Sequence, residues 1–282
     1  MASRSRKIIH IALLAGLVVY AVVAIRYCSE REAGLRCTGV RIEVQDSTRS
    51  GFVTPGLVRQ WLSDSGLYRE GAALRSIDVH AVEQLVERQD YVRQADAYTA
   101  IDGLLHIVLN QRHPVLRIVS EAGHNFYIDS TLVLLPPHPD CTADVPAVSG
   151  RFSFAFPPGH FGPLDEKKFP QEQEVLHNLL NFVHQVDTDR FLGALIAQIY
   201  YDGREIRLVP RVGSQTIRFG SIADSVLVRQ RLQKLSRFYR RSFAEGWWRS
   251  AAEIDLRFRG QVVCKGMPVP PADEPERAEK HN

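Results

Sequence analysis

The chain has 282 residues, of which 45% are hydrophobic and 24% are charged. These are ordinary values for globular proteins, so most of the chain has enough apolar side chains to bury a core. The formal net charge of +3 is too small to indicate nucleic-acid binding, and no RNP, zinc-finger or helix-turn-helix pattern accompanies it.

The first element is an apolar run from Ile8 to Ile25, which only His10 interrupts. Extended to Tyr27 as a helix, it is about 30 Å long, which is the thickness of a bilayer core. Because basic residues precede the run, we expect a cytoplasmic tail at 1–7, a transmembrane helix at 8–27 and the rest of the chain beyond the membrane. The alternative is a cleaved signal peptide, whose apolar region is normally only about 7–15 residues long.

A first compact unit is predicted at residues 37–114 in the order strand, helix, helix, strand, strand. The expected elements are a strand at 40–44, helices beginning near Pro55 and Asp78, and strands at 91–101 and 104–112. Asp102-Gly103, between the last two strands, is a strong hairpin signal. This order of elements is that of a POTRA domain.

Residues 115–264 are richer in strand patterns and predict a second domain, which is mainly antiparallel with two flanking helices. The helices are expected at 174–184 and 225–240, and the strands at 117–119, 126–128, 195–201, 205–209, 215–219 and about 254–264. The chain is therefore predicted to be an α+β protein with one N-terminal transmembrane helix. Its end, 265–282, is rich in proline and charge and is predicted to be a disordered tail.

The last predicted strand alternates apolar and charged side chains from Ile254 to Arg259, so one of its faces is expected to meet a core. A terminal strand is often a sheet edge, and an open edge is a template for a strand of another protein. The alternative is an edge that Arg257 and Arg259 protect from pairing. The residues alone favour this alternative, because charged edges are usual.

The helix before that strand is strongly basic. Four of its side chains form a candidate cationic face for an acidic partner: Arg229, Lys234, Arg237 and Arg241. The other interpretation is a solvated helix side, and the sequence favours neither.

No enzyme motif of the serine hydrolase, penicillin-binding, zinc protease or P-loop kind is present, so no catalytic residue and no cofactor are predicted. Asp187 and Asp189 form a carboxylate pair that is more typical of capping or turn chemistry. The segment His138–Cys141 has metal-capable side chains, but its proline-rich loop offers no scaffold for tetrahedral ligation, so no metal site is predicted.

Four cysteines would lie at or beyond the outer face of the membrane, where disulfides persist. Cys141 and Cys264 share the second predicted domain. A disulfide between them and a pair of buried reduced thiols are both open alternatives.

Five segments carry a resemblance to a known family: Tyr91–Ala95, Gln111–Pro114, Phe126–Asp129, Val145–Gly150 and Ile254–Phe258. The first resembles a "YV-x-x-A" segment, the second an "R-x-P" signature between two domains, and the last a terminal "(I/V)-D-L-R-Y" strand. Their order and spacing, together with a single N-terminal anchor, resemble the FtsQ/DivIB cell-division family.

The resemblance implies a non-enzymatic scaffold of the divisome, which recruits and links membrane proteins at the division septum. It implies an anchor in the inner (cytoplasmic) membrane, with both folded domains in the periplasm. The implied partners are FtsB-type and FtsL-type bitopic proteins and other divisome membrane proteins, with no nucleic acid and no small-molecule substrate.

In the family, the last strand pairs with a strand of the FtsB-type partner, and the arginine and tyrosine of the terminal motif contact it. These positions fall on Arg257 and Phe258, so the tyrosine hydroxyl is missing here. The resemblance therefore favours the binding hypothesis and implies six partner-binding residues: Asp255, Leu256, Arg257, Phe258, Arg259 and Gln261. It also implies a POTRA/β junction at Arg112 and Pro114.

Two other functions fit parts of the sequence. An outer-membrane assembly or secretion factor with a POTRA domain would need a transmembrane barrel of many alternating segments, which the second domain does not supply. An anchored periplasmic cell-wall factor with enzymatic activity would need a convergent set of catalytic groups, which the sequence does not contain.

Overall fold

The computed structural model describes residues 14–23, 35–45, 51–245 and 251–266. Residues 14–23 form a helix with exposed apolar side chains, among them Leu17 and Tyr20. Over these described ranges, no helix has both the length and the apolar character needed to cross a membrane. The other parts of the predicted span, 8–13 and 24–27, lie outside the described residues. So do the predicted cytoplasmic tail, 1–7, and most of the predicted C-terminal tail, 265–282.

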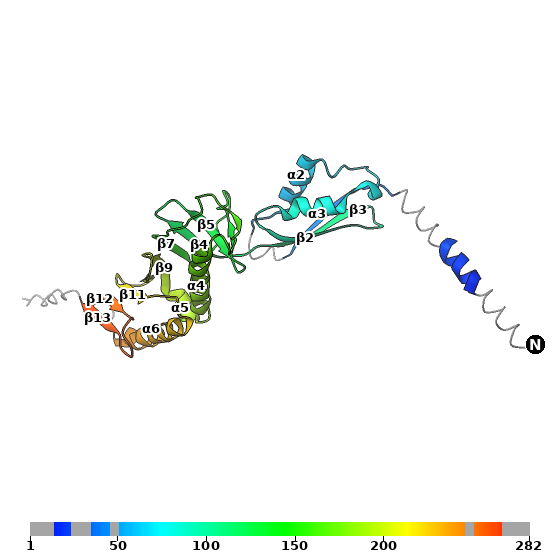
Figure 1. Ribbon diagram of the computed structural model, residues 1–282. Coiled ribbons are helices and arrows are strands. Elements are labelled where there is room, and N and C mark those ends of the chain that lie inside the picture. Colours follow the sequence, from blue (N-terminus) through cyan, green and yellow to red (C-terminus); the bar gives the residue numbers. More distant parts are fainter. Residues whose placement is uncertain (1–13, 24–34, 46–50, 246–250, 267–282) are drawn as a thin grey trace, which may run out of the picture. The chain divides into compact units, whose positions relative to one another are not determined.

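The chain divides into two compact units, residues 1–112 and 113–282 (Figure 1). The sequence predicted a change of domain at Pro114. Pro114 is the first residue of the first strand of the second unit, and the backbone N–H of Arg112 donates to the Tyr91 carbonyl oxygen at 2.8 Å.

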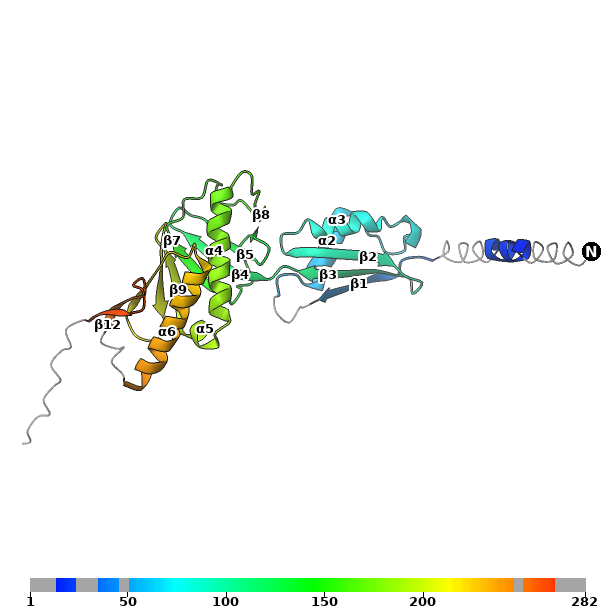
Figure 2. The ribbon, with the colours of Figure 1, turned by 60° about the horizontal axis from the view of Figure 1, so that its bottom comes forward.

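The first unit has the predicted order of elements. They are β1 (Gly39–Gln45), α2 (Pro55–Ser65), a 3-10 turn (Leu74–Ser76), α3 (Val79–Glu87), β2 (Val92–Thr99) and β3 (Leu104–Gln111). The sheet order is β1-β3-β2, with β1 parallel and β2 antiparallel to β3. Both α-helices lie over this sheet (Figure 2).

Local chemistry explains the ends of these elements. The Thr54 hydroxyl accepts from the backbone N–H of Leu57 at 3.3 Å, and the Asp78 carboxylate accepts from that of Ala81 at 3.0 Å, so each caps a helix. Gly103 turns the β2–β3 hairpin with a φ of 79°, a conformation that glycine adopts without strain.

The second unit is one large sheet covered by helices. Its strands are β4 (Pro114–Ser120), β5 (Asn125–Asp129), β6 (Val133–Leu135), β7 (Ala147–Gly150), β8 (Gly162–Pro163), β9 (Ile196–Tyr201), β10 (Ile206–Pro210), β11 (Thr216–Gly220), β12 (Ala251–Asp255) and β13 (Val263–Gly266). Their order is β13-β12-β11-β10-β9-β7-β4-β5-β6-β8, and most neighbouring strands are antiparallel, as predicted.

The helices of this unit are α4 (Pro170–Asp187), α5 (Arg190–Leu195) and α6 (Ser225–Glu245), which pack against one another and on the sheet (Figure 2). The sequence predicted two flanking helices for this domain, whereas its described residues form three. The extra helix α5 begins where the Asp189 carboxylate accepts from the Phe191 N–H at 2.9 Å. Asp189 is thus the capping residue that the sequence favoured over a catalytic carboxylate.

Candidate partner-binding site at the C-terminal hairpin

The predicted terminal strand at 254–264 is a hairpin. β12 ends at Asp255, the chain turns through residues 256–262, and β13 returns antiparallel with Asp255 opposite Val263. β12 also pairs with β11 in parallel, so it is not a sheet edge. Among the described strands, β13 is the one that forms this edge. The chain reverses its direction in this turn, and Gly260 adopts a φ of 73° there, which glycine does without strain.

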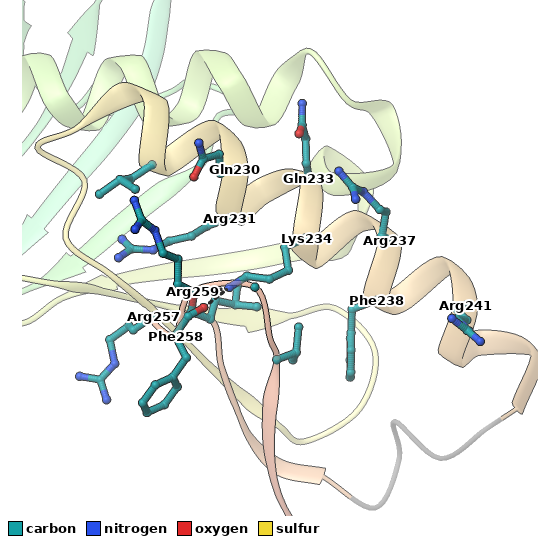
Figure 3. A pocket seen from close by; sticks show the side chains of 14 residues that line it. Gln230, Arg231, Gln233, Lys234, Arg237, Phe238, Arg241, Arg257, Phe258 and Arg259 are labelled. Carbon is teal, nitrogen blue, oxygen red and sulfur yellow. Dashed lines mark hydrogen bonds between the residues drawn. The ribbon is translucent and has the colours of Figure 1, made fainter.

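Lys234 of α6 holds the turn together. Its ammonium group donates to three backbone carbonyl oxygens of the turn: Leu256 at 2.7 Å, Phe258 at 2.7 Å and Gln261 at 3.1 Å. Figure 3 shows the side chain reaching from the helix towards the turn. An ammonium group has three N–H donors, so Lys234 has none left for a partner. Partial burial lowers the pKa of Lys234, and the nearby Arg231 lowers it further.

Arg257 is folded back onto the sheet. Its guanidinium donates to both carboxylate oxygens of Asp255, and the shortest of these distances is 2.8 Å. It also donates to the carboxylate of Glu205, the residue just before β10, at 3.3 Å. Hydrogen bonds from Arg257 are the main reason that the pKa of Asp255 lies below its usual value. Gly220 makes room for this arrangement, since an added Cβ would lie 2.9 Å from the Arg257 Cγ.

Phe258, the next residue, is displayed at the surface with 46% of its area exposed. It stands beside a groove of about 470 Å³ between α6 and the turn (Figure 3). Apolar side chains of the groove come from both sides: Leu227, Phe238, Leu256 and Val262. Such a surface, apolar at its centre, is typical of a site for another protein.

The groove has a basic rim. Arg237 and Arg241 of α6 line it together with Arg259 of the turn, and no carboxylate lines it within the described residues. Unlike Lys234 and Arg257, these three side chains make no ion pair or hydrogen bond with any described residue. They are the cations of this surface that remain available to an acidic partner.

The structure divides the six predicted contact residues into two groups. Asp255 and Leu256 are buried and Arg257 is held by carboxylates, whereas Phe258, Arg259 and Gln261 are exposed. The predicted alternation holds for Ile254 and Leu256, which are buried, but fails at Asp255, which is also buried, and at Phe258, which is exposed. Leu256 is buried because the turn folds under α6, which no local pattern indicates.

The predicted cationic face of α6 is also divided. Lys234, Arg237 and Arg241 line the groove, but the exposed Arg229 does not. Of the apolar side chains of this surface, the sequence predicted Leu256 and Phe258 and missed Leu227, Phe238 and Val262. The apolar spacing of the helix assigned Tyr239 to the buried stripe, where it lies. It gave no role to the adjacent Phe238, which is only partly buried.

The disulfide between Cys141 and Cys264 that the sequence left open is not formed, and the described residues contain no disulfide. Cys264 lies exposed on β13, and Cys141 lies in the loop before β7, a strand five positions away in the sheet order. Neither side chain is buried, so the alternative of two buried thiols does not describe them either. No group of three or more metal-ligating side chains occurs in the described ranges.

Comparison with known proteins gives two matches. The family model described as FtsQ/DivIB, C-terminal related, matches residues 113–265, and the POTRA-like domain model matches residues 35–110. The boundary between the two matched regions coincides with the boundary between the two compact units. No curated protein sequence matches the chain.

Proposed function

Because this chain belongs to the FtsQ/DivIB family of cell-division proteins, we propose that it is a divisome scaffold that recruits and links septal membrane proteins. Members of the family are non-enzymatic, and we propose the same for this chain. In this proposal, residues 8–27 anchor it in the inner membrane, residues 1–7 are cytoplasmic, and the POTRA-like and β domains work in the periplasm.

The observation that carries the proposal is the exposure of Phe258 on a turn whose backbone is held by hydrogen bonds. Lys234 holds the turn through three of its carbonyl oxygens, and Arg257 holds it through the carboxylates of Asp255 and Glu205. An ordered turn loses less conformational entropy on binding a partner than a mobile one does. Exposed aromatic and arginine side chains are also the commonest hot spots of protein interfaces.

We propose that the partner is an FtsB-type bitopic protein, with an FtsL-type protein in the same assembly. A strand of the partner would add to the open edge of β13, Val263–Gly266, and an adjoining segment would cover Phe258. Acidic side chains of that segment would meet Arg237, Arg241 and Arg259. Main-chain hydrogen bonds would then supply affinity, and the side chains at the groove would supply the choice of partner.

The first test is Phe258→Ala in the full chain, with binding to the periplasmic part of the FtsB-type protein measured by biolayer interferometry. We expect affinity to fall about thirtyfold, as for a hot-spot aromatic, with an unchanged melting temperature. Tyr98→Ala is the matched control, because Tyr98 is 50% exposed but lies in the first unit. Wild-type affinity of the Phe258→Ala protein would exclude the turn from the interface.

A pair of proline substitutions tests the strand edge. Consecutive residues of a strand direct their N–H groups to opposite sides, so one of Cys264 and Lys265 donates towards β12 and the other outwards. We expect proline to destabilise the fold at the position whose N–H points towards β12. At the other position, of the two variants Cys264→Pro and Lys265→Pro, proline should weaken only partner binding. If neither changes binding without changing stability, strand addition at β13 is wrong.

The proposed location has its own test. A C-terminal alkaline phosphatase fusion should be active in cells, and a fluorescent fusion should collect at mid-cell during division. An inactive phosphatase fusion at a normal protein level would contradict the orientation, and an even distribution around the cell would contradict the role in division.

A further inference from the structure

A second and smaller pocket lies away from the groove, between the start of α4, β9 and the segment that follows β7. Its volume is about 180 Å³. The side chains that define it are Phe152, Phe154, Glu172, Val175 and Tyr201. No contact with the C-terminal hairpin contributes to it, so it is independent of the proposed partner site.

Three aromatic rings form one wall of this pocket in a continuous row. Phe152 stacks on Phe154, with ring centroids 5.1 Å apart and planes 15° from parallel. Phe152 also packs on Tyr201 at 4.9 Å and 31°. Phe152 and Tyr201 are almost fully buried and Phe154 is half-buried, so the row runs from the core to the surface. Phe154 stacks in turn on Phe156, with centroids 4.8 Å apart and planes 16° from parallel. The rings therefore cover one another's faces, and the row is an apolar wall against which the carbon chain of a long side chain can pack.

Glu172 adds a negative charge to this aromatic wall. The residue is only 9% exposed, and one carboxylate oxygen accepts from the Ala155 N–H at 2.9 Å. The other oxygen has no hydrogen-bond or ion-pair partner among the described residues, and no lysine, arginine or histidine lines the pocket. Glu172 lies in the first turn of α4, where the helix dipole stabilises a negative charge.

We propose that this pocket binds the side chain of one lysine or arginine from a protein partner. The buried carboxylate without a counter-ion would pair with the charged end of that side chain, and the aromatic wall would pack against its carbon chain. The volume suits one long side chain. A partner protein is favoured over a free amine, because contacts around the mouth, where Ser153 and Gln171 are exposed, would supply the remaining affinity.

The test is an NMR titration of the full chain in lipid nanodiscs, with carbon-13 in the phenylalanine and tyrosine rings. The probes are the peptides acetyl-Gly-Lys-Gly-amide and acetyl-Gly-Arg-Gly-amide, and the neutral control has norleucine at the centre. We expect the basic peptides to shift the ring signals of Phe154 and Tyr201, less so at high salt. Equal shifts from the norleucine peptide would overturn the proposal, because the pocket would then be merely apolar.

Glu172→Gln removes the charge but keeps an oxygen that can accept from the Ala155 N–H. We expect it to weaken binding of the basic peptides about tenfold. The matched control is Glu174→Gln, an exposed carboxylate on the same helix, which should bind as the wild type does. Should Glu172→Gln fail to fold, Phe154→Leu keeps the carboxylate, removes part of the aromatic wall and should weaken binding severalfold. Wild-type binding by a folded Glu172→Gln or Phe154→Leu protein would refute the cation site.

Discussion

Reversing the charge of Arg257 is expected to destabilise the second unit and not merely to remove a contact with a partner. Arg257 contributes three hydrogen bonds to Asp255, between 2.8 and 3.2 Å, and one to Glu205. In the Arg257→Glu protein, a third carboxylate would lie beside these two. The Asp255 side chain is only 4% exposed, so water would not replace the lost partner.

The magnitude follows from this burial. Removing one partner of a buried ion pair costs about 3–5 kcal/mol, because the other charge remains uncompensated. The Arg257 side chain is 30% exposed, so solvent already screens part of the interaction, and we expect about 2–3 kcal/mol. For a unit of this size, each kcal/mol lowers the melting temperature by about 2–4 °C.

The assay is thermal unfolding of the full chain, followed by tryptophan fluorescence and circular dichroism. Arg259→Glu is the matched control, because it makes the same change of charge two residues away on an exposed side chain. We expect Arg257→Glu to melt about 5–10 °C below Arg259→Glu. Equal melting temperatures would refute the reasoning, since Arg257 would then be a surface charge like its neighbour.

The pH dependence gives an independent check of the same pair. Arg257 lowers the pKa of Asp255, and a carboxyl pKa that is lower in the folded state stabilises the fold above its unfolded value of about 3.9. That contribution is lost as the pH falls through the lowered pKa. The stability difference between the wild type and Arg257→Gln should therefore shrink below about pH 4, and a constant difference down to pH 2 would contradict the pairing.

Three further predictions concern the packing of the second unit. Lys234→Met should lower stability by about 1–2 kcal/mol and weaken partner binding, whereas the exposed-helix control Arg229→Met should do neither. Burial raises the pKa of Tyr239 to about 12, so the folded state keeps a proton that the unfolded state loses above about pH 10. Denaturant titrations should therefore show that the wild type loses stability between about pH 10 and 12. The Tyr239→Phe protein should lose less stability over the same range. Gly150→Ala should prevent folding, as judged by circular dichroism, because the new Cβ would overlap the Tyr201 carbonyl oxygen, and a stable variant would contradict the β7–β9 pairing.

The first unit was predictable from sequence because its signals are local. Thr54 and Asp78 cap the helices that they were expected to start, and Asp102-Gly103 forms the expected hairpin. Apolar spacing then identified the buried faces, since Val82 and Val86 of α3 are fully buried. Each of these features depends on residues within one turn of helix or one hairpin, which a single sequence contains.

The C-terminal region was not predictable in the same way. Ile254 and Leu256 are both fully buried, as their alternation suggested, but only the first of them lies in β12. The turn that buries Leu256 depends on Lys234, which is 22 residues earlier in the chain. Only Gly260 gave a local signal of this turn, and a glycine near a chain end is weak on its own.

The basic residues around the hairpin therefore have two different roles. Lys234 and Arg257 make their hydrogen bonds inside the unit. Replacing either residue should therefore change the shape of the turn and weaken the binding of any partner that contacts it. Arg237 and Arg259 have no such bonds, so their loss acts through charge alone and should slow association most at low salt. Stability and salt dependence, measured together, separate the two roles where binding affinity by itself does not. In the proposed scaffold, the fixed turn would present Phe258 and the exposed arginines would select an acidic partner.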